Sequence, residues 1–261
     1  MVKGDFHMHS TFCDGKNTPE EMVNTAIQKG MTSLGICVHS YQFFDESFCI
    51  KKEKQKGFLE LMASLKEKYK DKIKLYAGVE LEYFSEFDTS GFDYIIGSVH
   101  YVKYDDNYLV VDSSRIHIDE ATEKYFGGDI YAYCEAYYEL VGDVCNKTNC
   151  NIIGHIDLVT KFNEGDVHFD TKNPRYINAD RKAVDKLVKY NVPFEMNTGA
   201  ISRGYRTSPY PSDDILEYIL SKGGKIVLSS DAHNCDSIGL EFDKCEENLK
   251  KYGVINPEFS I

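Results

Sequence analysis

Short apolar runs rich in valine, isoleucine and phenylalanine alternate along the chain with longer amphipathic stretches. This alternation is typical of βα units, in which parallel strands form one sheet and helices cover it. The runs that predict strands lie at residues 2–8, 33–38, 73–79, 94–97, 151–154, 192–196 and 225–229. Seven βα units in 261 residues favour an α/β fold with a closed or nearly closed barrel, formed as one domain over residues 1–261. A doubly wound open sheet is the competing fold, because the pattern does not give the strand order.

The clearest helix signal is Thr18-Pro19-Glu20-Glu21, which combines an N-cap, a proline at the first helical position and a capping-box glutamate. It predicts a helix that Gly30 ends. Further helices are expected at about 52–69, 119–147, 178–190, 213–221 and 242–251, with a break at Gly127-Gly128. The stretch 98–117 is expected to be a long insertion, and 197–210 is expected to be a loop.

The charge and the cysteine content limit the binding partners and the cellular compartment that we expect for this protein. Lysine and arginine total 30 against 42 acidic residues, a formal charge of -12, whereas phosphate contacts with nucleic acid need a basic surface. No apolar run approaches the roughly 18 residues of a membrane span, and Met1 opens onto a lysine-containing strand rather than an export signal. The eight cysteines contain no CxxC pair, which favours reduced thiols. We therefore expect a soluble cytoplasmic protein without nucleic-acid or membrane partners; the sequence does not indicate its oligomeric state.

Six of the eight histidines stand at the predicted ends of strands, together with two carboxylates. In chain order these residues are His7, His9, His39, Glu80, His100, His155, Asp231 and His233. Active sites of βα barrels lie at the carboxyl ends of the strands, so residues scattered along the sequence converge on one rim. The other two histidines, His117 and His168, are expected to be ordinary hydrogen-bonded residues.

The His7-Met8-His9 spacing has a direct physical interpretation. Residues two apart on a strand point to the same face, so both imidazoles can reach one cation. Glu80 or Asp231 can bridge two cations and balance their charge. The pattern therefore predicts a metal cluster. Its ligands are all nitrogen and oxygen, which suits Zn²⁺, Mn²⁺ or Fe²⁺ and does not select among them.

The motifs in combination resemble a known family. They are Asp-Phe-His-Met-His at 5–9, Cys-Asp-Gly at 13–15, His39, Gly-Val-Glu at 78–80, Ser-Val-His at 98–100, Gly-His-Ile-Asp at 154–157 and Ser-Asp-Ala-His at 230–233. This set resembles the PHP superfamily of metal-dependent phosphoesterases, from residue 5 to about residue 239. Within it the chain looks like the single-domain histidinol-phosphate phosphatases, in its size and in the stretches 154–159 and 195–212.

The resemblance implies a distorted (β/α)7 TIM-like barrel that holds two to three divalent transition-metal ions. One metal would take His7, His9, Glu80 and Asp231, a second would share Glu80 and add His100 and His155, and a third would take Asp14, His39 and His233. Glu80, Asp231 and His233 are expected to serve catalysis directly. Glu82 is expected to lie outside the ligand set.

The activity implied by the resemblance is hydrolysis of a phosphomonoester, L-histidinol phosphate, to L-histidinol and phosphate in histidine biosynthesis. Metal-activated hydroxide would attack phosphorus. Arg203 would bind the phosphate oxygens, with Arg206 and Lys161 as further candidates, although Arg203 could equally be a loop residue in solvent. The chain departs from the family pattern at Asp14, where histidine is common, and at Lys161, where arginine is more typical.

Other functions compete with this one. The same superfamily contains nucleases and other small-molecule phosphoesterases, and metal-dependent amidohydrolases share the HxH motif and the aspartate after the last strand. A metal-binding module without catalysis is a further alternative, which the complete ligand set disfavours. Cys13, Cys37 and Cys235 lie next to proposed ligands and are expected to be small packing residues.

Overall fold

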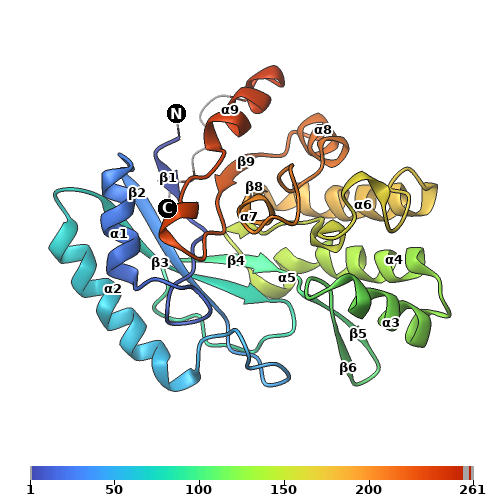
Figure 1. Ribbon diagram of the computed structural model, residues 1–261, viewed down its shortest axis with the longest axis horizontal. Helices are drawn as coiled ribbons and strands as arrows, with labels where there is room; N and C mark the ends of the chain where they lie inside the picture. Colours follow the sequence, from blue (N-terminus) through green and yellow to red (C-terminus); the bar gives the residue numbers. More distant parts are fainter. Residues whose placement is uncertain (1, 255–258, 260–261) are drawn as a thin grey trace.

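The computed structural model describes residues 2–254 and 259, which form a central parallel sheet of seven strands. In spatial order the strands are β1 (Gly4–Asp5), β2 (Ser33–His39), β3 (Lys74–Glu82), β4 (Tyr94–Ser98), β7 (Ile152–Ile153), β8 (Phe194–Asn197) and β9 (Ile226–Ser229) (Figure 1). Every predicted strand is present, although β1 and β7 are shorter than predicted. The strands follow one another in chain order, whereas a doubly wound sheet reverses its order, so the open-sheet alternative is wrong.

The first and last strands meet just beyond their carboxyl ends. Met8, after β1, forms a parallel bridge with Ala232, after β9. The His9 amide donates to the Ala232 carbonyl at 2.8 Å, and the Ala232 amide donates to the His7 carbonyl at 3.2 Å. The sheet is therefore a nearly closed, distorted (β/α)7 barrel, as predicted, and its closing contact holds the backbone of both histidines.

Tyr94 fills the inside of the barrel from β4 and is almost completely buried. Its hydroxyl donates to the Phe6 carbonyl and lies 3.1 Å from Cys37 Sγ. Gly35 and Gly78 make room for this ring, because a Cβ on either residue would overlap the tyrosine. The interior is thus closely packed, which leaves the loops at the strand ends to form the site.

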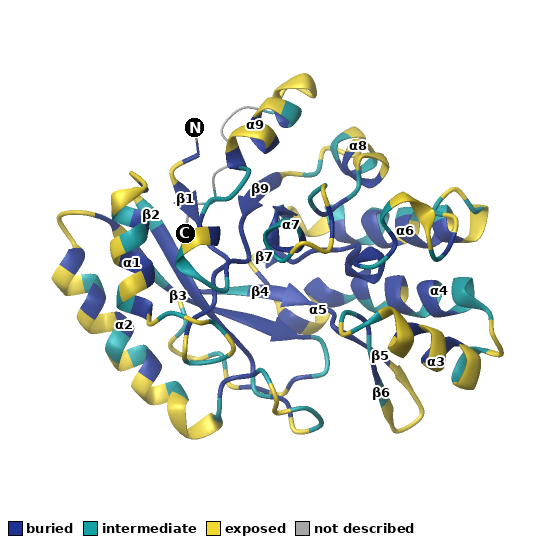
Figure 2. Cartoon of the chain, in the orientation of Figure 1, coloured by how far each residue is buried: buried dark blue, intermediate teal, exposed yellow. Residues whose placement is uncertain are grey.

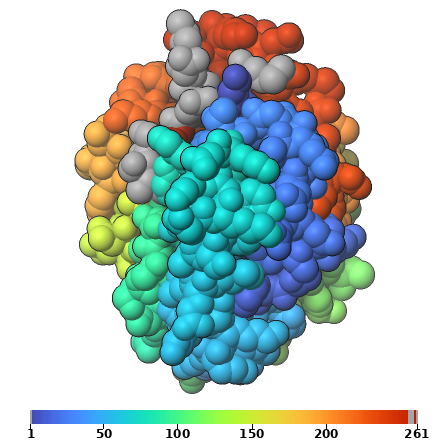
Figure 3. Space-filling view, turned by 90° about the vertical axis from the view of Figure 1, so that its left-hand side faces the viewer, coloured from blue at the N-terminus to red at the C-terminus, as the bar shows by residue number. Residues whose placement is uncertain are grey.

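Nine α-helices are present in the described residues, and most of them cover the outside of the barrel. They are α1 (Pro19–Gln28), α2 (Gln55–Tyr69), α3 (Arg115–Phe126), α4 (Ile130–Val141), α5 (Val144–Thr148), α6 (Pro174–Leu187), α7 (Gly199–Ser202), α8 (Asp213–Ser221) and α9 (Phe242–Lys251). Their inner faces are buried and their outer faces exposed (Figure 2). On the side seen in Figure 3, α1 and α2 lie next to each other, joined by the bond from the Tyr69 hydroxyl to Glu20 at 2.8 Å. None of the helices in the described part of the chain combines the length and apolar character needed to cross a membrane.

Helix boundaries follow capping chemistry. The capping box at α1 is present as predicted, with the Glu21 amide donating to Thr18 Oγ1 at 3.3 Å and the Thr18 amide donating to Glu21 Oε2 at 2.7 Å. The predicted helix 178–190 instead begins at Pro174, because the Asn173 side chain accepts the Arg175 amide at 2.9 Å. The predicted helix 119–147 is divided into α3, α4 and α5, with the expected break at Gly127.

Two segments have more structure than the sequence predicts. The stretch 98–117 contains an antiparallel hairpin of β5 (Tyr101–Tyr104) and β6 (Asn107–Val110), followed by the first turn of α3. The stretch 197–210 contains the short helix α7. Both segments lie at the carboxyl side of the barrel strands, where they form walls of the site.

Candidate metal centre

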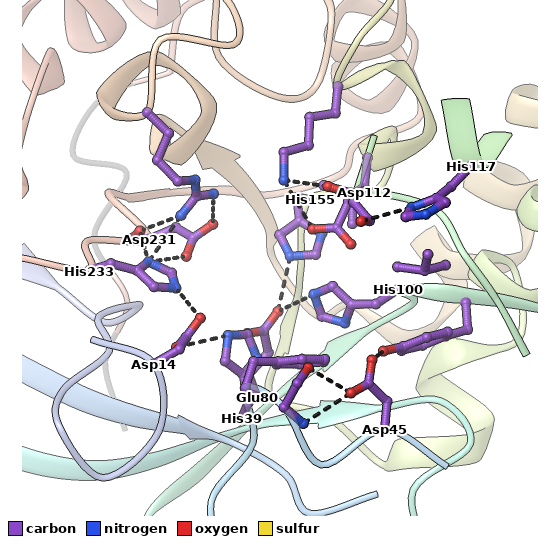
Figure 4. Close-up of a pocket in the computed structure, with 18 residues that line it drawn as sticks. Asp14, His39, Asp45, Glu80, His100, Asp112, His117, His155, Asp231 and His233 are labelled. Atoms are coloured by element: carbon purple, nitrogen blue, oxygen red, sulfur yellow. Dashed lines mark hydrogen bonds and ion pairs between the residues drawn. The ribbon is translucent and has the colours of Figure 1, made fainter. Parts of the chain in front are cut away.

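The loops at the carboxyl ends of the strands enclose a cavity of about 450 Å³ (Figure 4). Among the residues that line it are Asp14, His39, Glu80, His100, His155, Asp231 and His233. The remaining two predicted ligands, His7 and His9, are fully buried, and their Nε2 atoms lie 3.2 and 3.4 Å from Glu80 Oε2. The structure therefore brings all nine predicted ligands together.

Glu80 lies at the centre of this arrangement (Figure 4). Besides contacting the two buried histidines, its Oε2 lies 2.9 Å from His39 Nδ1. Its other oxygen, Oε1, lies 3.0 Å from His155 Nε2 and 3.3 Å from His100 Nε2. Each carboxylate oxygen thus faces a different set of imidazoles, which is the geometry required of a carboxylate that bridges two cations.

Among the buried atoms of the site that have no hydrogen-bond partner in the described residues, four face one another: His7 Nε2, His9 Nε2, Glu80 Oε2 and Asp231 Oδ1. Asp231 Oδ1 lies 3.5 Å from His9 Nε2 and 3.8 Å from His7 Nε2. Unpaired polar atoms in a protein interior are costly, and a cation among them would satisfy all four. These donors therefore fit a transition-metal ion such as zinc, manganese or iron.

A further group of donors surrounds Asp14. Its Oδ2 lies 3.1 Å from His233 Nε2, and its Oδ1 lies 3.6 Å from His39 Nε2. With His9, these residues offer one donor atom each within 4.8 Å of one another. His9 was expected to serve a different metal from Asp14, but its ring stacks on that of His39 at 4.1 Å and so lies between the two groups.

Neighbouring charged groups shift the pKa values of the central carboxylates and of His9. Burial alone would raise the pKa of Glu80, but His7, His39 and His100 hold it well below its ordinary value. Burial would likewise raise the pKa of Asp231, which Arg203 and the neighbouring histidines keep well below its usual range. Burial and the adjacent imidazoles lower the pKa of His9 to about 3, so this ring is neutral and can donate a lone pair.

A family model, the PHP domain, matches residues 5–223. The chain belongs to the PHP family. It is 28% identical to a Schizosaccharomyces pombe protein named "Probable histidinol-phosphatase" over 95% of this chain and 86% of that one. It is 25% identical to the histidinol-phosphatase of Bacillus subtilis over 93% of this chain and 98% of that one.

A solved structure shares the fold of this PHP chain. It is histidinol phosphate phosphatase from Lactococcus lactis complexed with zinc, L-histidinol and phosphate, with a TM-score of 0.76, 22% identity and coverage of 100% of this chain and 99% of that one. Family membership, together with the buried donor groups, makes this chain a PHP metal-dependent phosphoesterase with a multinuclear metal site.

Two further glutamates support the histidines of this PHP site, and sequence reasoning missed both. Glu195, on β8, lies 2.7 Å from His7 Nδ1. Glu82, which was predicted to lie outside the ligand set, has its Oε2 2.9 Å from His100 Nδ1. The same oxygen accepts a hydrogen bond from the His100 backbone amide at 2.8 Å. A carboxylate on one ring nitrogen orients the other toward a metal. The sequence did contain a sign of the role of Glu195. It lies inside the apolar run 192–196, and an acidic residue buried in a strand requires a polar or charged partner.

The three basic candidates occupy different places. Arg203 lines the cavity, and its guanidinium donates to Asp231 Oδ2 at 2.9 Å. Lys161 also lines the cavity and donates from Nζ to the Asp112 carbonyl at 2.7 Å. Arg206 is not among the cavity-lining residues, because its guanidinium is buried against Thr160 and Tyr210 instead. Arg206 thus lies outside the lining of this cavity, and its contact with substrate stays a prediction.

The outer wall of the cavity comes from the loop after β2, the hairpin and the start of α3. The loop after β2 supplies Phe48 and the hairpin supplies Tyr101. Asp45, from the same loop as Phe48, and His117, from the first turn of α3, are labelled in Figure 4. His117 is hydrogen-bonded, as predicted, with Nδ1 3.0 Å from Ser113 Oγ, and it also lines the cavity. The other unassigned histidine, His168, is bonded to Asp119 and is not among the cavity-lining residues.

The three cysteines near the centre make packing contacts. Cys37 is fully buried and donates from Sγ to the Phe6 carbonyl at 3.2 Å. Cys235 packs against Met22, with the sulfurs 3.7 Å apart. Cys13 is closest to the centre, with Sγ 3.5 Å from His9 Nδ1. Burial raises the pKa of Cys13 and Cys37 to about 12, which disfavours thiolates at neutral pH.

Proposed function

We propose that this PHP phosphoesterase hydrolyses L-histidinol phosphate to L-histidinol and phosphate. The observation that carries the proposal is near-complete, colinear similarity to proteins named histidinol-phosphatase, which spans more than nine tenths of this chain in both fungal and bacterial relatives. The Lactococcus protein of the same fold, which holds zinc, L-histidinol and phosphate, is consistent with it.

The charges of the cavity also favour a zwitterionic substrate. Arg203 and Lys161 supply positive charge beside the metal-ligand groups, where a phosphate would bind. On the outer wall, Asp45 Oδ1 accepts from the Ser47 amide at 3.0 Å and Asp45 Oδ2 accepts from the Tyr101 hydroxyl at 2.7 Å. These donors are neutral, and they lower the pKa of Asp45 against the effect of burial. Asp45 is therefore a fixed anion that can pair with the ammonium group of an amino alcohol.

We assign the nine converging residues as ligands of two to three cations: His7, His9, Asp14, His39, Glu80, His100, His155, Asp231 and His233. When bound, such cations neutralise phosphate charge and acidify the attacking water. Asp231 stays ionised beside Arg203, so this pair fixes the guanidinium at the edge of the donor group. Arg203 and Lys161 bind phosphate oxygens and hold phosphorus in one orientation, which lowers the entropic cost of reaction.

Phosphate release by the reconstituted protein tests the proposal. The metal-free chain is loaded with Zn²⁺, Mn²⁺ or Fe²⁺ and assayed with L-histidinol phosphate, p-nitrophenyl phosphate, bis-p-nitrophenyl phosphate and single-stranded DNA. We expect the highest kcat/KM with L-histidinol phosphate and little cleavage of the diester or DNA. Rapid DNA degradation without phosphate release from L-histidinol phosphate would overturn the assignment and favour a nuclease.

A further inference from the structure

Arg206 is an unusual residue to find enclosed, because arginine is rarely buried without a specific partner. It is only 8% exposed, outside the cavity that holds the metal-ligand groups. Its Nη1 donates to Thr160 Oγ1 at 2.6 Å, and its guanidinium carbon lies 4.7 Å from the centre of the Tyr210 ring. This geometry aims the guanidinium at the loop that follows β7.

The contact with Thr160 reaches the residue next to Lys161. Thr160 ends the short 3₁₀ helix Leu158–Thr160, and its hydroxyl donates to the Asp157 carbonyl at 2.7 Å. That bond uses the only hydroxyl proton of Thr160, so the oxygen is left to accept from Arg206. The backbone of Lys161, the next residue, is therefore held in place. Its side chain extends to the cavity, where Nζ donates a hydrogen bond to the Asp112 carbonyl.

The loop after β8 is held to the same segment at a second point. The buried Asp157 accepts the Ser212 amide on Oδ2 at 2.9 Å, and the same oxygen lies 4.0 Å from Arg206 Nη1. Arg203 stands three residues before Arg206, at the end of α7. Two hydrogen bonds, from Arg206 to Thr160 and from Ser212 to Asp157, thus join the loop that carries Arg203 to the loop that carries Lys161.

We propose that Arg206 is a positioning residue that sets the separation of Lys161 and Arg203, so that both can contact one phosphate group. This inference rests on the proposed phosphomonoesterase function. Two flexible cationic side chains bind a phosphate well only when their backbones are fixed beforehand, because otherwise binding must order both loops. Arg206 acts through Thr160 and touches neither metal nor substrate.

A double-mutant cycle tests the proposal with Arg206→Met, Thr160→Val and the two combined. Binding of inorganic phosphate is measured by calorimetry on metal-loaded protein, alongside KM, kcat and metal content. We expect each single variant to weaken phosphate binding and raise KM by roughly tenfold, with unchanged metal content and kcat within about threefold. The double variant should lose no more than either single variant, because both substitutions remove the same contact. Arg206→Lys should restore part of the loss.

The matched control is Arg181→Met. Arg181 also lies over a tyrosine, with its guanidinium carbon 3.9 Å from the Tyr218 ring centre, and it pairs with Asp180 at 3.6 Å, away from the cavity. This variant should lose stability without weakening phosphate binding. If Arg206→Met unfolds, Thr160→Val alone decides the question.

Unchanged phosphate affinity in Thr160→Val, or fully additive losses in the double variant, would overturn the positioning role. The calorimetric measurement does not depend on turnover. If the unaltered protein binds phosphate but fails to hydrolyse phosphomonoesters, the proposed function falls while the positioning role is still tested. A lack of phosphate binding by the unaltered protein would overturn both.

Discussion

Glu80 joins the donor groups of the site, because its two oxygens face different histidines and its side chain is almost fully buried. In Glu80→Gln the shape is kept, but the negative charge and one acceptor oxygen are lost. We therefore expect the loss of more than one metal per chain and a fall in kcat/KM of well over the roughly 100-fold typical of supporting residues. Metal analysis and phosphate release measure both effects.

Two glutamates on or near β3 serve as controls for that variant. Glu82→Gln weakens the support of His100, so we expect a loss of about 10- to 100-fold in metal affinity or activity, smaller than that of Glu80→Gln. Glu86 is exposed in the loop after β3, and Glu86→Gln should change neither quantity. Equal losses in all three variants would mean general destabilisation and contradict the bridging role.

Asp45 tests the recognition of a cationic substrate. Asp45→Asn keeps the side-chain size but removes the charge that would pair with an ammonium group. We expect KM for L-histidinol phosphate to rise by about tenfold, the scale of one charged hydrogen bond, with little change for p-nitrophenyl phosphate. A parallel rise for both substrates would show that Asp45 shapes the loop and does not recognise charge.

For individual residues, the sequence predicts which side chains come together at the metal site. It does not predict the hydrogen-bond partners that hold those side chains in place. The histidines, Glu80 and Asp231 could be located because each follows a strand, and parallel strands end at one rim. The pairing of Glu82 with His100 leaves no pattern in the sequence, since it depends on the register of β3 against β4. The same holds for Arg206 and Thr160, which lie on the separate segments that follow β8 and β7.

The start of α7 is built around Gly199. A Cβ at this position would lie 2.6 Å from Asp231 Oδ2 and 2.8 Å from Arg203 Nη2, so only glycine allows this ion pair to approach the helix. Gly199→Ala should displace the pair, destabilise the protein by about 1–3 kcal/mol and lower both metal content and kcat/KM. Thermal melting and steady-state kinetics measure these changes.

Gly204, just beyond α7, is the matched control. Its φ is 74°, but apart from its two chain neighbours no described residue has an atom within 4 Å of a Cβ built there. Gly204→Ala should cost about 1 kcal/mol through backbone strain and leave kcat/KM unchanged. A Gly199→Ala variant with normal kinetics would contradict the tight approach of α7 to Asp231.

Elements with strong local signals are the ones the sequence predicts best. Thr18 and Glu21 set the start of α1 as expected. Asn173-Pro174 carries a similar signal for α6, but the start of that helix was predicted four residues late, at residue 178. The hairpin of β5 and β6 was missed because its turn contains Asp105 at a φ of 50° without the glycine that usually marks such a turn.

For the molecule as a whole, the seven barrel strands and a closed or nearly closed barrel could be predicted, but the contact that closes the barrel could not. Seven βα units are visible in the sequence, whereas the joining of the sheet edges depends on one bridge, Met8 to Ala232. In the first segment Met8 stands between His7 and His9, and in the second segment Ala232 follows Asp231 directly. Metal binding at these residues should therefore hold the barrel closed.

Removal of metal should accordingly lower the stability of the whole barrel. A ligand present at about a hundred times its Kd stabilises the folded state by about 2.7 kcal/mol. For a chain of this size, that corresponds to a rise in Tm of roughly 5–10 °C. We expect chelation to lower Tm by this amount and re-addition of metal to restore it. The Glu80→Gln variant should show a much smaller shift, and an equal shift would place the stabilising metal elsewhere.

The central claim is that Glu80 bridges metals in a multinuclear centre at the barrel rim. Anomalous diffraction at the metal edge, on crystals of the reconstituted protein, tests it most directly. We predict at least two peaks about 3.5–4 Å apart, one beside each oxygen of Glu80. One peak would lie near His7, His9 and Asp231, and the other near His100 and His155. A single peak, or peaks that do not contact Glu80, would contradict the account.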